Sequence, residues 1–500
     1  MNLSFLILIP FLTLLALLAG NGAQFSRMIA AVGMTIQLGL SVFLAFAYCA
    51  ERTAGNTTTM LFQTEVSWFK PLGINYHVGV DGISIAMILL TAIVMLAGVL
   101  ISWNIEKMTK EFFILFMLLG AGAFGFFMSL DLFALFFFFE LAVIPKYLLI
   151  AIWGSGRKEF FAMKLALMLM AGSALALVGI FGIHFNSAAA DGTMSWNLIE
   201  IGKVHIPIAA QRLFFPLTFI GFGVISALFP FHTWAPDGHS SAPTAASMFL
   251  AGISMKLGGY GCLRVAIYLM PEAAKEYAPI IITLAVIGIL YGAFATVKQT
   301  DLKYMNAYSS VSHCGFVILG IGMLTKTAAT GAVLQMVSHG LMTALFFAVI
   351  GMVYDRSHTR IGAQMGGLLK VIPFIGTAFI ISGLCSLGLP GLSGFVAEMN
   401  VLTGAFEVNS MYPRIITLLA ACSLVVTSVY ILRMTGLVML GPLKKEEFRN
   451  FKDARWTERL ASYILIVAII GMGVLPFWLS GMISDSMGGI FDNLHLLAGN

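Results

Sequence analysis

Charge is scarce in this sequence of 500 residues. Asp, Glu, Lys and Arg together make up only 10%, whereas hydrophobic residues make up 59% and the mean hydropathy is +0.94. A soluble protein of this length could not hide so much apolar surface, because many residues of any folded chain remain exposed. The composition therefore excludes an ordinary soluble globular protein and indicates one whose solvent is a lipid bilayer.

Metal-binding and nucleotide-binding motifs are also missing. The five cysteines, at positions 49, 262, 314, 385 and 422, form no C-x-x-C pair and no metal-ligand spacing, which argues against iron–sulfur, zinc and disulfide sites. The sequence has no G-x-x-x-x-G-K loop and no G-x-G-x-x-G after a strand. We therefore expect no cofactor in this chain and an external source of energy for its activity.

Long apolar runs fill most of the chain. A transmembrane helix needs about 20 mainly apolar residues. The sequence contains fourteen such stretches, near 3–20, 28–49, 82–102, 112–130, 132–153, 161–185, 212–230, 243–270, 279–297, 302–324, 330–354, 372–405, 413–437 and 459–483. The first lacks the basic start of a signal peptide and is kept as a span. We predict an all-α polytopic membrane protein with about fourteen transmembrane helices.

The loops between these stretches differ in their Lys and Arg content. The odd-numbered loops hold seventeen of these residues and the even-numbered loops hold seven. Cytoplasmic loops of membrane proteins carry the excess of positive charge. The odd-numbered loops are therefore predicted to be cytoplasmic and both termini to lie outside. The basic segment 442–460 is predicted to be a solvated loop or an interfacial helix on the cytoplasmic side.

Five ionisable residues interrupt the apolar runs: Glu140, Lys256, His313, His339 and Glu398. A charged side chain at mid-bilayer costs about 2.5–3.5 kcal/mol on insertion scales, so such residues usually face a polar interior. Taken singly, a histidine could be a helix–helix hydrogen-bonding residue, and a lysine or glutamate near a span end could reach the surface. Together, acids, amines and imidazoles on several helices can relay protons. We therefore predict a buried proton pathway through these residues.

Proline breaks two of the predicted helices. The stretch LFPFHTWAPDGHSSAP (228–243) contains Pro230 and Pro236 beside His232 and His239, and SLGLPGLSGF (386–395) contains Pro390. A break at membrane depth is tolerated where the backbone lines a cavity or is buried in protein. Two interrupted helices in corresponding positions are typical of repeat transporters with the pathway at the breaks. We predict that these five residues line the pathway.

Several motifs resemble one membrane-protein family. FPFHTWAPDGHSSAPTAASMFLAGISMKLGGYGCLR (229–264) resembles the signature of the antiporter-like subunits of respiratory complex I. FFFFELAVIPKYLLIAIWG, SSVSHCGF, QMVSHGLMTALFF and LGLPGLSGFVAE also occur in the family's order. The resemblance covers nearly the whole chain and is best to the M-type members.

The resemblance implies a fold and an activity. The family fold has two inverted five-helix repeats, which here implies N-terminal helices in 1–111, a first repeat in 112–270, a second in 279–437, and a basic segment with a last helix in 438–500. The implied activity is proton translocation in a bacterial inner membrane, driven by partner subunits that hold NADH, FMN, iron–sulfur clusters and quinone. L-type and N-type antiporter-like subunits are the implied neighbours.

Residue roles also follow from the resemblance. Glu140 matches a glutamate that modulates a neighbouring lysine, and Lys256 matches the lysine of the central axis. The two histidines, His313 and His339, match polar links of that axis. Glu398 matches the acid near the exit path.

One position departs from the family pattern. The family usually carries a lysine five residues before the proline of FPFH, where this chain has Ile225. Lys146, which follows Pro145, is unusual for the family and could supply the missing charge. Pro145 lacks an N–H and can bend the helix, turning Lys146 towards the interior near Ser226. Alternatively, Lys146 reaches the cytoplasmic interface, or the first half of the pathway is altered or silent.

Two other functions remain open at this point. A cation/proton antiporter subunit of Mrp type would also need no cofactor motif. A structural membrane spacer without transport would explain the missing lysine, although the buried Glu, Lys and His residues argue against it. Co-purification with redox subunits would distinguish the first reading from the Mrp-type antiporter.

Overall fold

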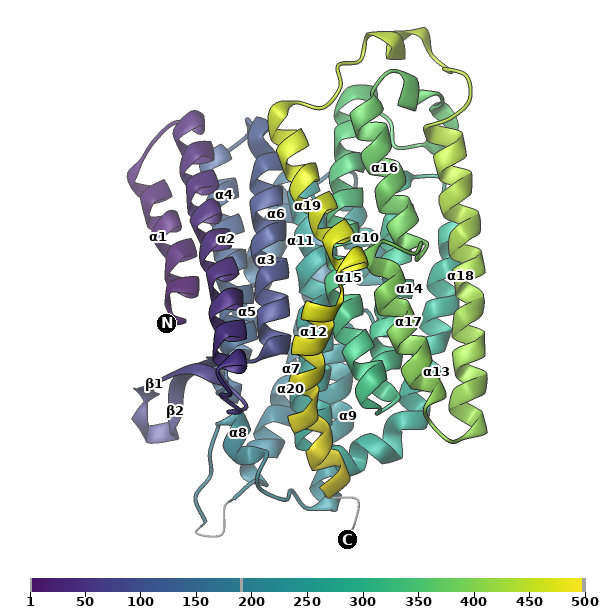
Figure 1. The fold of residues 1–500 in the computed structure, drawn as a ribbon. Coiled ribbons are helices and arrows are strands. Elements are labelled where there is room, and N and C mark those ends of the chain that lie inside the picture. Colours follow the sequence, from purple (N-terminus) through teal and green to yellow (C-terminus); the bar gives the residue numbers. More distant parts are fainter. Residues whose placement is uncertain (1, 189–191, 497–500) are drawn as a thin grey trace.

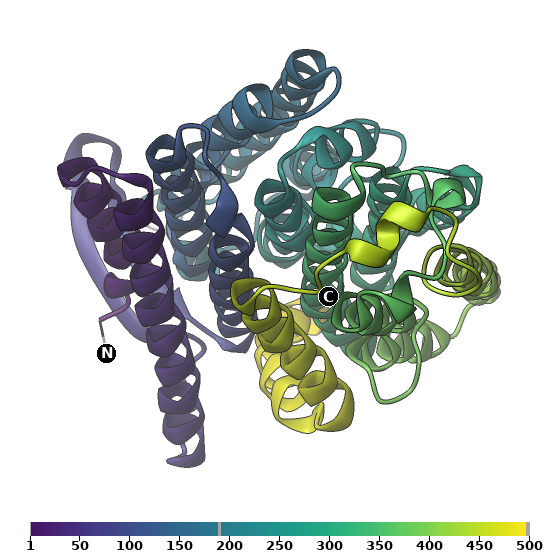
Figure 2. The ribbon, with the colours of Figure 1, turned by 90° about the horizontal axis from the view of Figure 1, so that it is seen from above.

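The computed structural model describes residues 2–188 and 192–496 of the chain. Residues 1, 189–191 and 497–500, which include the outer ends of the predicted segments 1–111 and 438–500, lie outside the described residues. Most of the described chain forms helices that run side by side (Figure 1). Seen from above, α1 and α2 lie at one side of the bundle and α18 at the opposite side (Figure 2).

The N-terminal part contains a feature that the sequence did not reveal. Its elements are α1 (Phe5–Ala19), α2 (Ala23–Thr53), β1 (Leu61–Phe69), β2 (Ile74–Val80), α3 (Gly82–Ile101) and α4 (Thr109–Met128). The strands β1 and β2 pair antiparallel from Leu61↔Val80 to Phe69↔Ile74. Gly73 lies at the turn with a φ of +66°, which glycine adopts without strain. The prediction of an all-α protein is therefore wrong for this loop, although helices dominate the rest.

The next part contains the first interrupted helices. Its elements are α5 (Leu132–Leu141), α6 (Val143–Trp153), α7 (Lys158–Phe185), α8 (Leu198–Ile201), α9 (Ile208–Ile225), α10 (Trp234–Ser241), α11 (Thr244–Phe249), η3 (Leu250–Ser254), α12 (Met255–Gly261) and η4 (Cys262–Ile267). The helix at 132–153 is interrupted at Ala142, three residues before Pro145. Proline cannot donate the hydrogen bond that would continue the helix there.

The C-terminal half surrounds one central helix. Its elements are α13 (Pro271–Lys298), α14 (Leu302–Gly322), α15 (Lys326–Ser357), α16 (Pro373–Ser386), α17 (Ser393–Phe406), α18 (Met411–Val438), η7 (Glu446–Asn450), α19 (Trp456–Val474) and α20 (Phe477–Leu496). The most apolar stretch of α15 is wholly buried, and this helix contacts α3, α11, α14, α16, α17, α19 and α20. In Figure 1, η7 lies at the upper end of the bundle, and β1, β2 and the end of α20 lie at the lower end.

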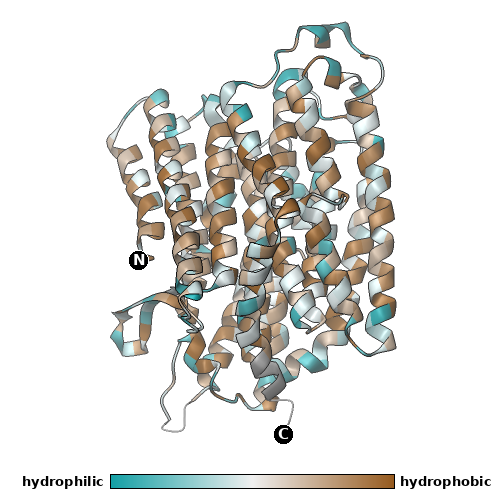
Figure 3. Cartoon of the chain, in the orientation of Figure 1, coloured by the Kyte–Doolittle hydropathy of each residue, from teal (hydrophilic) through white to brown (hydrophobic). Residues whose placement is uncertain are grey.

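Ten helices of the described chain are long and apolar enough to cross a membrane. The other four predicted spans are also helical, but α1 is short, α14 is less apolar, and the stretches 244–267 and 373–406 are divided into shorter elements. Many large hydrophobic side chains of the described chain are exposed. In Figure 3, hydrophobic residues run along much of the helices, and hydrophilic residues gather towards the two ends of the bundle. The chain is therefore a multi-pass membrane protein, and the number fourteen stays a prediction.

A buried ion pair joins the N-terminal helices to the central bundle. Asp81 caps α3 by accepting a 2.9 Å hydrogen bond from the Ser84 N–H, and its other carboxylate oxygen pairs with the Arg264 guanidinium of η4. The two side chains are 1% and 4% exposed. The Arg264 guanidinium also lies 5.6 Å from the centre of the Tyr260 ring. Such a pair fixes the position of α3 against the helix that carries Lys256.

We expect Asp81→Ala to destabilise the protein by about 3–5 kcal/mol, because removing one partner leaves a buried charge uncompensated. The denaturation temperature of the detergent-solubilised protein would report the loss. Asp81→Ala/Arg264→Met should be less destabilised, since it leaves no unpaired charge. Equal stability of the wild type and Asp81→Ala would contradict the role of the pair.

Candidate functional site

Lys256 lies between two π-helical segments. It belongs to α12, which is flanked by η3 and η4, and its side chain is 1% exposed. In a π turn the helical hydrogen bonds skip to the fifth residue, and such turns are frequent at functional sites. The Lys256 Nζ donates to the Ala251 carbonyl of η3, five residues back, at 2.5 Å. The irregular helix thus supplies a backbone partner to the buried amine.

The same amine reaches the central helix. Lys256 Nζ lies 2.5 Å from Nδ1 of His339 on α15. The His339 ring lies 5.4 Å, centre to centre, from the ring of His313 on α14. Both imidazoles are at most 3% exposed. Three residues that the sequence places on separate helices are therefore neighbours.

His313 connects this group to an acid. Its Nδ1 lies 3.3 Å from Oε1 of Glu398 on α17, and its Nε2 lies 3.0 Å from Oγ of Ser386 at the end of α16. Gln335 Nε2 approaches the same Nδ1 at 3.2 Å. Together, Lys256, His339, His313 and Glu398 form a row of buried ionisable groups on four helices, here called the polar axis.

The break between α16 and α17 makes room for the carboxylate. Gly388 lies in this break with a φ of +74°. A Cβ at this position would lie 2.7 Å from Oε2 of Glu398, closer than real Cβ contacts come. A side chain at position 388 would therefore displace the acid, which explains the glycine beside the predicted break.

The seventh predicted span is interrupted between Ile225 and Trp234. Pro230 lies in this break, whereas Pro236 lies inside the first turn of α10, where a missing N–H costs little. His239 of α10 is 0% exposed, and neither of its ring nitrogens has a hydrogen-bond partner among the described residues. α10 packs against α14, whose first turn carries Lys303, and contacts η3, which ends two residues before Lys256.

Three residues of the breaks lie away from the polar axis. Pro230 and Pro390 are exposed, so they end helices but do not line a buried path in this structure. His232 is buried, but its ring stacks on Phe229 at 5.4 Å and lies 4.8 Å from the ring of Tyr291 on α13. Of the five break residues that the sequence singled out, His239 is the ionisable one that lies towards the axis.

Lys146 points into the protein. It is 1% exposed, and its Nζ lies 5.8 Å from the centre of the Phe139 ring, which in turn packs 6.5 Å from the ring of Phe222 on α9. The charged group that acts on the amine is Glu140, from the other side of the break at Ala142. A lysine that reached the cytoplasmic interface would be exposed, so the burial of Lys146 argues against that alternative.

The sequence predicted that Lys146 approaches Ser226, but neither side chain makes a hydrogen bond within the described chain. Lys146 Nζ, Ser226 Oγ and one carboxylate oxygen of Glu140 are buried without such a partner in the described chain. Buried polar groups are almost always paired with protein or water. These three groups are therefore candidates for contacts with water or with each other in another state.

Sequence reasoning missed Gln335, Ser386 and Lys303. Gln335 lies four residues before His339, so both project from the same face of α15. Lys303 is one of the seventeen Lys and Arg residues assigned above to the odd-numbered loops. A lysine in the first turn of a helix is unfavourable for the helix dipole, and this mismatch at the start of α14 could have marked it.

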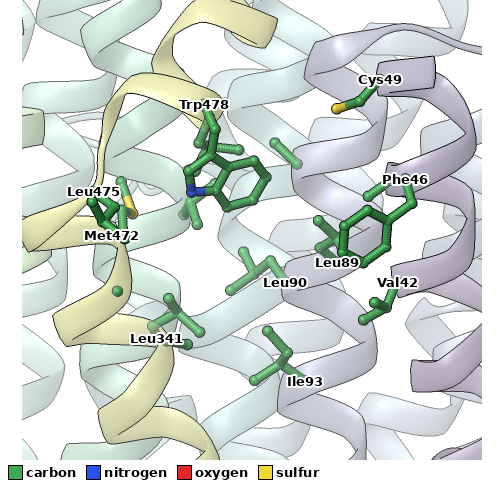
Figure 4. A pocket seen from close by; sticks show the side chains of 16 residues that line it. Val42, Phe46, Cys49, Leu89, Leu90, Ile93, Leu341, Met472, Leu475 and Trp478 are labelled. Atoms are coloured by element: carbon green, nitrogen blue, oxygen red, sulfur yellow. The ribbon is translucent and has the colours of Figure 1, made fainter. Parts of the chain in front are cut away.

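A pocket in another part of the bundle has no charged side chains in its wall. It has a volume of about 430 Å³ and lies between α2, α3, α15 and the α19–α20 break, with Phe46, Leu90 and Trp478 in its wall (Figure 4). Its lining contains no acid, amine or imidazole. Within the described ranges, no group of three His, Cys, Asp or Glu side chains is placed to hold a metal ion.

Comparisons with known proteins find similar membrane proteins. Residues 129–417 match the family described as NADH:quinone oxidoreductase/Mrp antiporter, TM. The NADH-quinone oxidoreductase subunit M of Rickettsia bellii is 36% identical over 437 residues, which cover 87% of this chain and 86% of the relative.

Two solved structures share the fold. A chain of the respiratory complex I from Thermus thermophilus with bound NADH has a TM-score of 0.89 at 23% identity, over 98% of this chain and 99% of that chain. A chain of the Mrp complex from Dietzia sp. has a TM-score of 0.83 at 17% identity, over 99% and 98%. At these identities the two structures bear on the fold alone.

Proposed function

Because the chain belongs to the NADH:quinone oxidoreductase/Mrp antiporter transmembrane family, we propose that it translocates protons in the membrane arm of a quinone-reducing respiratory complex. Its relative at 36% identity is an M subunit of NADH-quinone oxidoreductase. The chain would be a subunit of that enzyme without redox chemistry of its own. Electron transfer in partner subunits, which would hold NADH, FMN, iron–sulfur clusters and quinone, would drive it.

The polar axis is the observation that carries this proposal. Lys256, His339, His313 and Glu398 follow one another at contact or near-contact distance in the middle of an apolar bundle. An amine, an imidazole and a carboxyl can each take up and release one proton. Burying four such groups is costly, and ionisable residues within membrane spans usually mark ion or proton pathways. A proton could therefore pass from Lys256 through the two imidazoles to Glu398.

The interrupted helices support the rest of the proposed organisation. We assign a first repeat to 112–270, which contains the break after Ile225, and an inverted second repeat to 279–437, which contains the break after Ser386. N-terminal helices in 1–111 and a last helix in 438–500 flank them. The neighbours would be L-type and N-type antiporter-like subunits. The basic loops would face the cytoplasm of a bacterial cell, with both termini outside the inner membrane.

A cation/proton antiporter subunit is the second candidate, since the fold is shared with a chain of an Mrp complex. The two functions differ in their partners. In mild detergent, redox subunits should co-purify with a complex I subunit but not with an Mrp-type subunit. For a complex I subunit, proton uptake should depend on quinone reduction and not on a sodium gradient.

We expect Glu398→Gln to reduce proton uptake and coupled quinone reduction by about tenfold or more, because the amide keeps the shape of the carboxyl but cannot carry a proton. Membranes containing the assembled complex would be assayed, with assembly checked on native gels. The matched control is Glu407→Gln, which changes an exposed acid at the end of the same helix. Wild-type pumping in Glu398→Gln would remove this acid from the path.

A further inference from the structure

A polar cavity lies at the end of the bundle that carries the basic, odd-numbered loops. Its volume is about 280 Å³, many times the roughly 10–15 Å³ that one water molecule needs. The ends of α3, α6, α10 and α15 surround it, and its wall includes Ser102, Ser155, Asp355 and Lys303. Unlike the apolar pocket of Figure 4, this cavity can hold a cluster of water molecules.

Lys303 forms part of the cavity wall and is only 8% exposed. Its amine donates a hydrogen bond to the Ala242 carbonyl, just beyond the end of α10. Arg360 donates to the neighbouring Ser240 carbonyl at 2.9 Å and pairs with Asp301 at 3.4 Å. The negative end of the α10 dipole favours these cations. It offsets the unfavourable place of Lys303 in the first turn of α14.

His239 lies on the inner side of this contact. It precedes Ala242 by three residues on α10, which packs against α14 and contacts η3. Lys303 belongs to α14, and η3 ends two residues before Lys256, so α10 contacts the elements that lead to both lysines. The ring is fully buried and makes no hydrogen bond within the described chain. His239 is therefore an ionisable group between the cavity wall and the polar axis.

We propose that this cavity is where protons enter the polar axis, and that Lys303 passes each proton from the cavity water to His239. This inference rests on the proposed function. In the step, the neutral Lys303 amine takes a proton from cavity water and then gives one to an unprotonated nitrogen of His239, directly or through one water. The imidazolium gives its proton to the Lys256 amine. One positive charge moves inward and no electron is transferred.

The test must separate a proton carrier from a structural tie between α10 and α14. Lys303→Arg keeps a cationic hydrogen-bond donor, but arginine is not deprotonated in proteins. We expect both Lys303→Met and Lys303→Arg to lower proton uptake by about tenfold or more, with assembly unchanged. Wild-type uptake in Lys303→Arg would show a structural tie only and would overturn the inference.

Lys256→Ala in the same membranes distinguishes this inference from the proposed function. If Lys256→Ala pumps like the wild type, Lys256 is not in the pathway, and the proposed function loses the polar axis that carries it. If Lys256→Ala is inactive and Lys303→Arg is fully active, only the entry route is wrong.

A labelling experiment tests the route without altering Lys303. Ser155→Cys would be made in a chain with Cys49→Ser and Cys422→Ser, which removes the two exposed native thiols. A membrane-impermeant methanethiosulfonate, added from the side of the basic loops, should label the new thiol and slow proton uptake. Glu446→Cys, on the exposed η7 segment, should be labelled without a loss of uptake. Full uptake after complete labelling of Ser155→Cys would overturn the proposed entry.

Discussion

Lys256→Ala is expected to reduce proton uptake and coupled quinone reduction to a tenth or less of the wild-type rates. The Lys256 amine is the group that contacts the imidazole of His339 and, on the proposed route, receives protons from His239. Alanine removes the amine and leaves no proton carrier between His239 and His339. Proton uptake by energised membrane vesicles and quinone reduction in the same vesicles would measure the loss.

The matched control is Lys298→Ala, which removes an exposed lysine at the end of α13. Both variants should assemble, because Lys256 makes its contacts with one carbonyl and one imidazole and not with an acid whose charge would be left alone. Normal proton uptake in assembled Lys256→Ala would exclude Lys256 from the pathway.

Lys146→Met should impair proton uptake, and adding Ile225→Lys should partly restore it. Lys146 is buried beside Glu140, and position 225 is 0% exposed at the end of α9, where the resemblance implies a lysine in the family pattern. If the charge has moved from one helix to the other, returning it to α9 should replace the lost function. The restoration should be partial because a lysine placed at membrane depth costs about 2.5–3.5 kcal/mol.

Uptake rates of the single and double variants, normalised to assembled complex, would measure this exchange. Lys203→Met, which changes an exposed loop lysine, should pump normally. Impairment in Lys146→Met without any restoration by Ile225→Lys would mean that Lys146 has its own role. Full uptake in Lys146→Met would mean that the first half of the pathway does not depend on this charge.

Much of the fold was predictable because bilayer-spanning helices must be long and apolar. Helices occupy all of the predicted stretches, and the breaks after Ile225 and Ser386 lie beside the prolines that indicated them. The hairpin β1–β2 was not predicted, because its residues are too polar for a span and its pairing depends on two strands meeting in space. The π turns beside Lys256 were also missed, since they leave the apolar pattern of the helix unchanged.

The sequence by itself determined that this chain is a membrane protein, which of its ionisable residues lie within apolar stretches, and which family it resembles. Only the tertiary structure decided which of those residues touch. Lys256 and His339 are 83 positions apart, and His313 and Glu398 are 85 positions apart, yet both pairs lie within 3.3 Å. Periodicity places a residue on a face of its own helix, but the neighbour of that face is chosen by packing among all the helices. The same packing brings Lys303 to the end of α10 and gives Pro230 and Pro390 an exposed place, which no local pattern in the sequence could show.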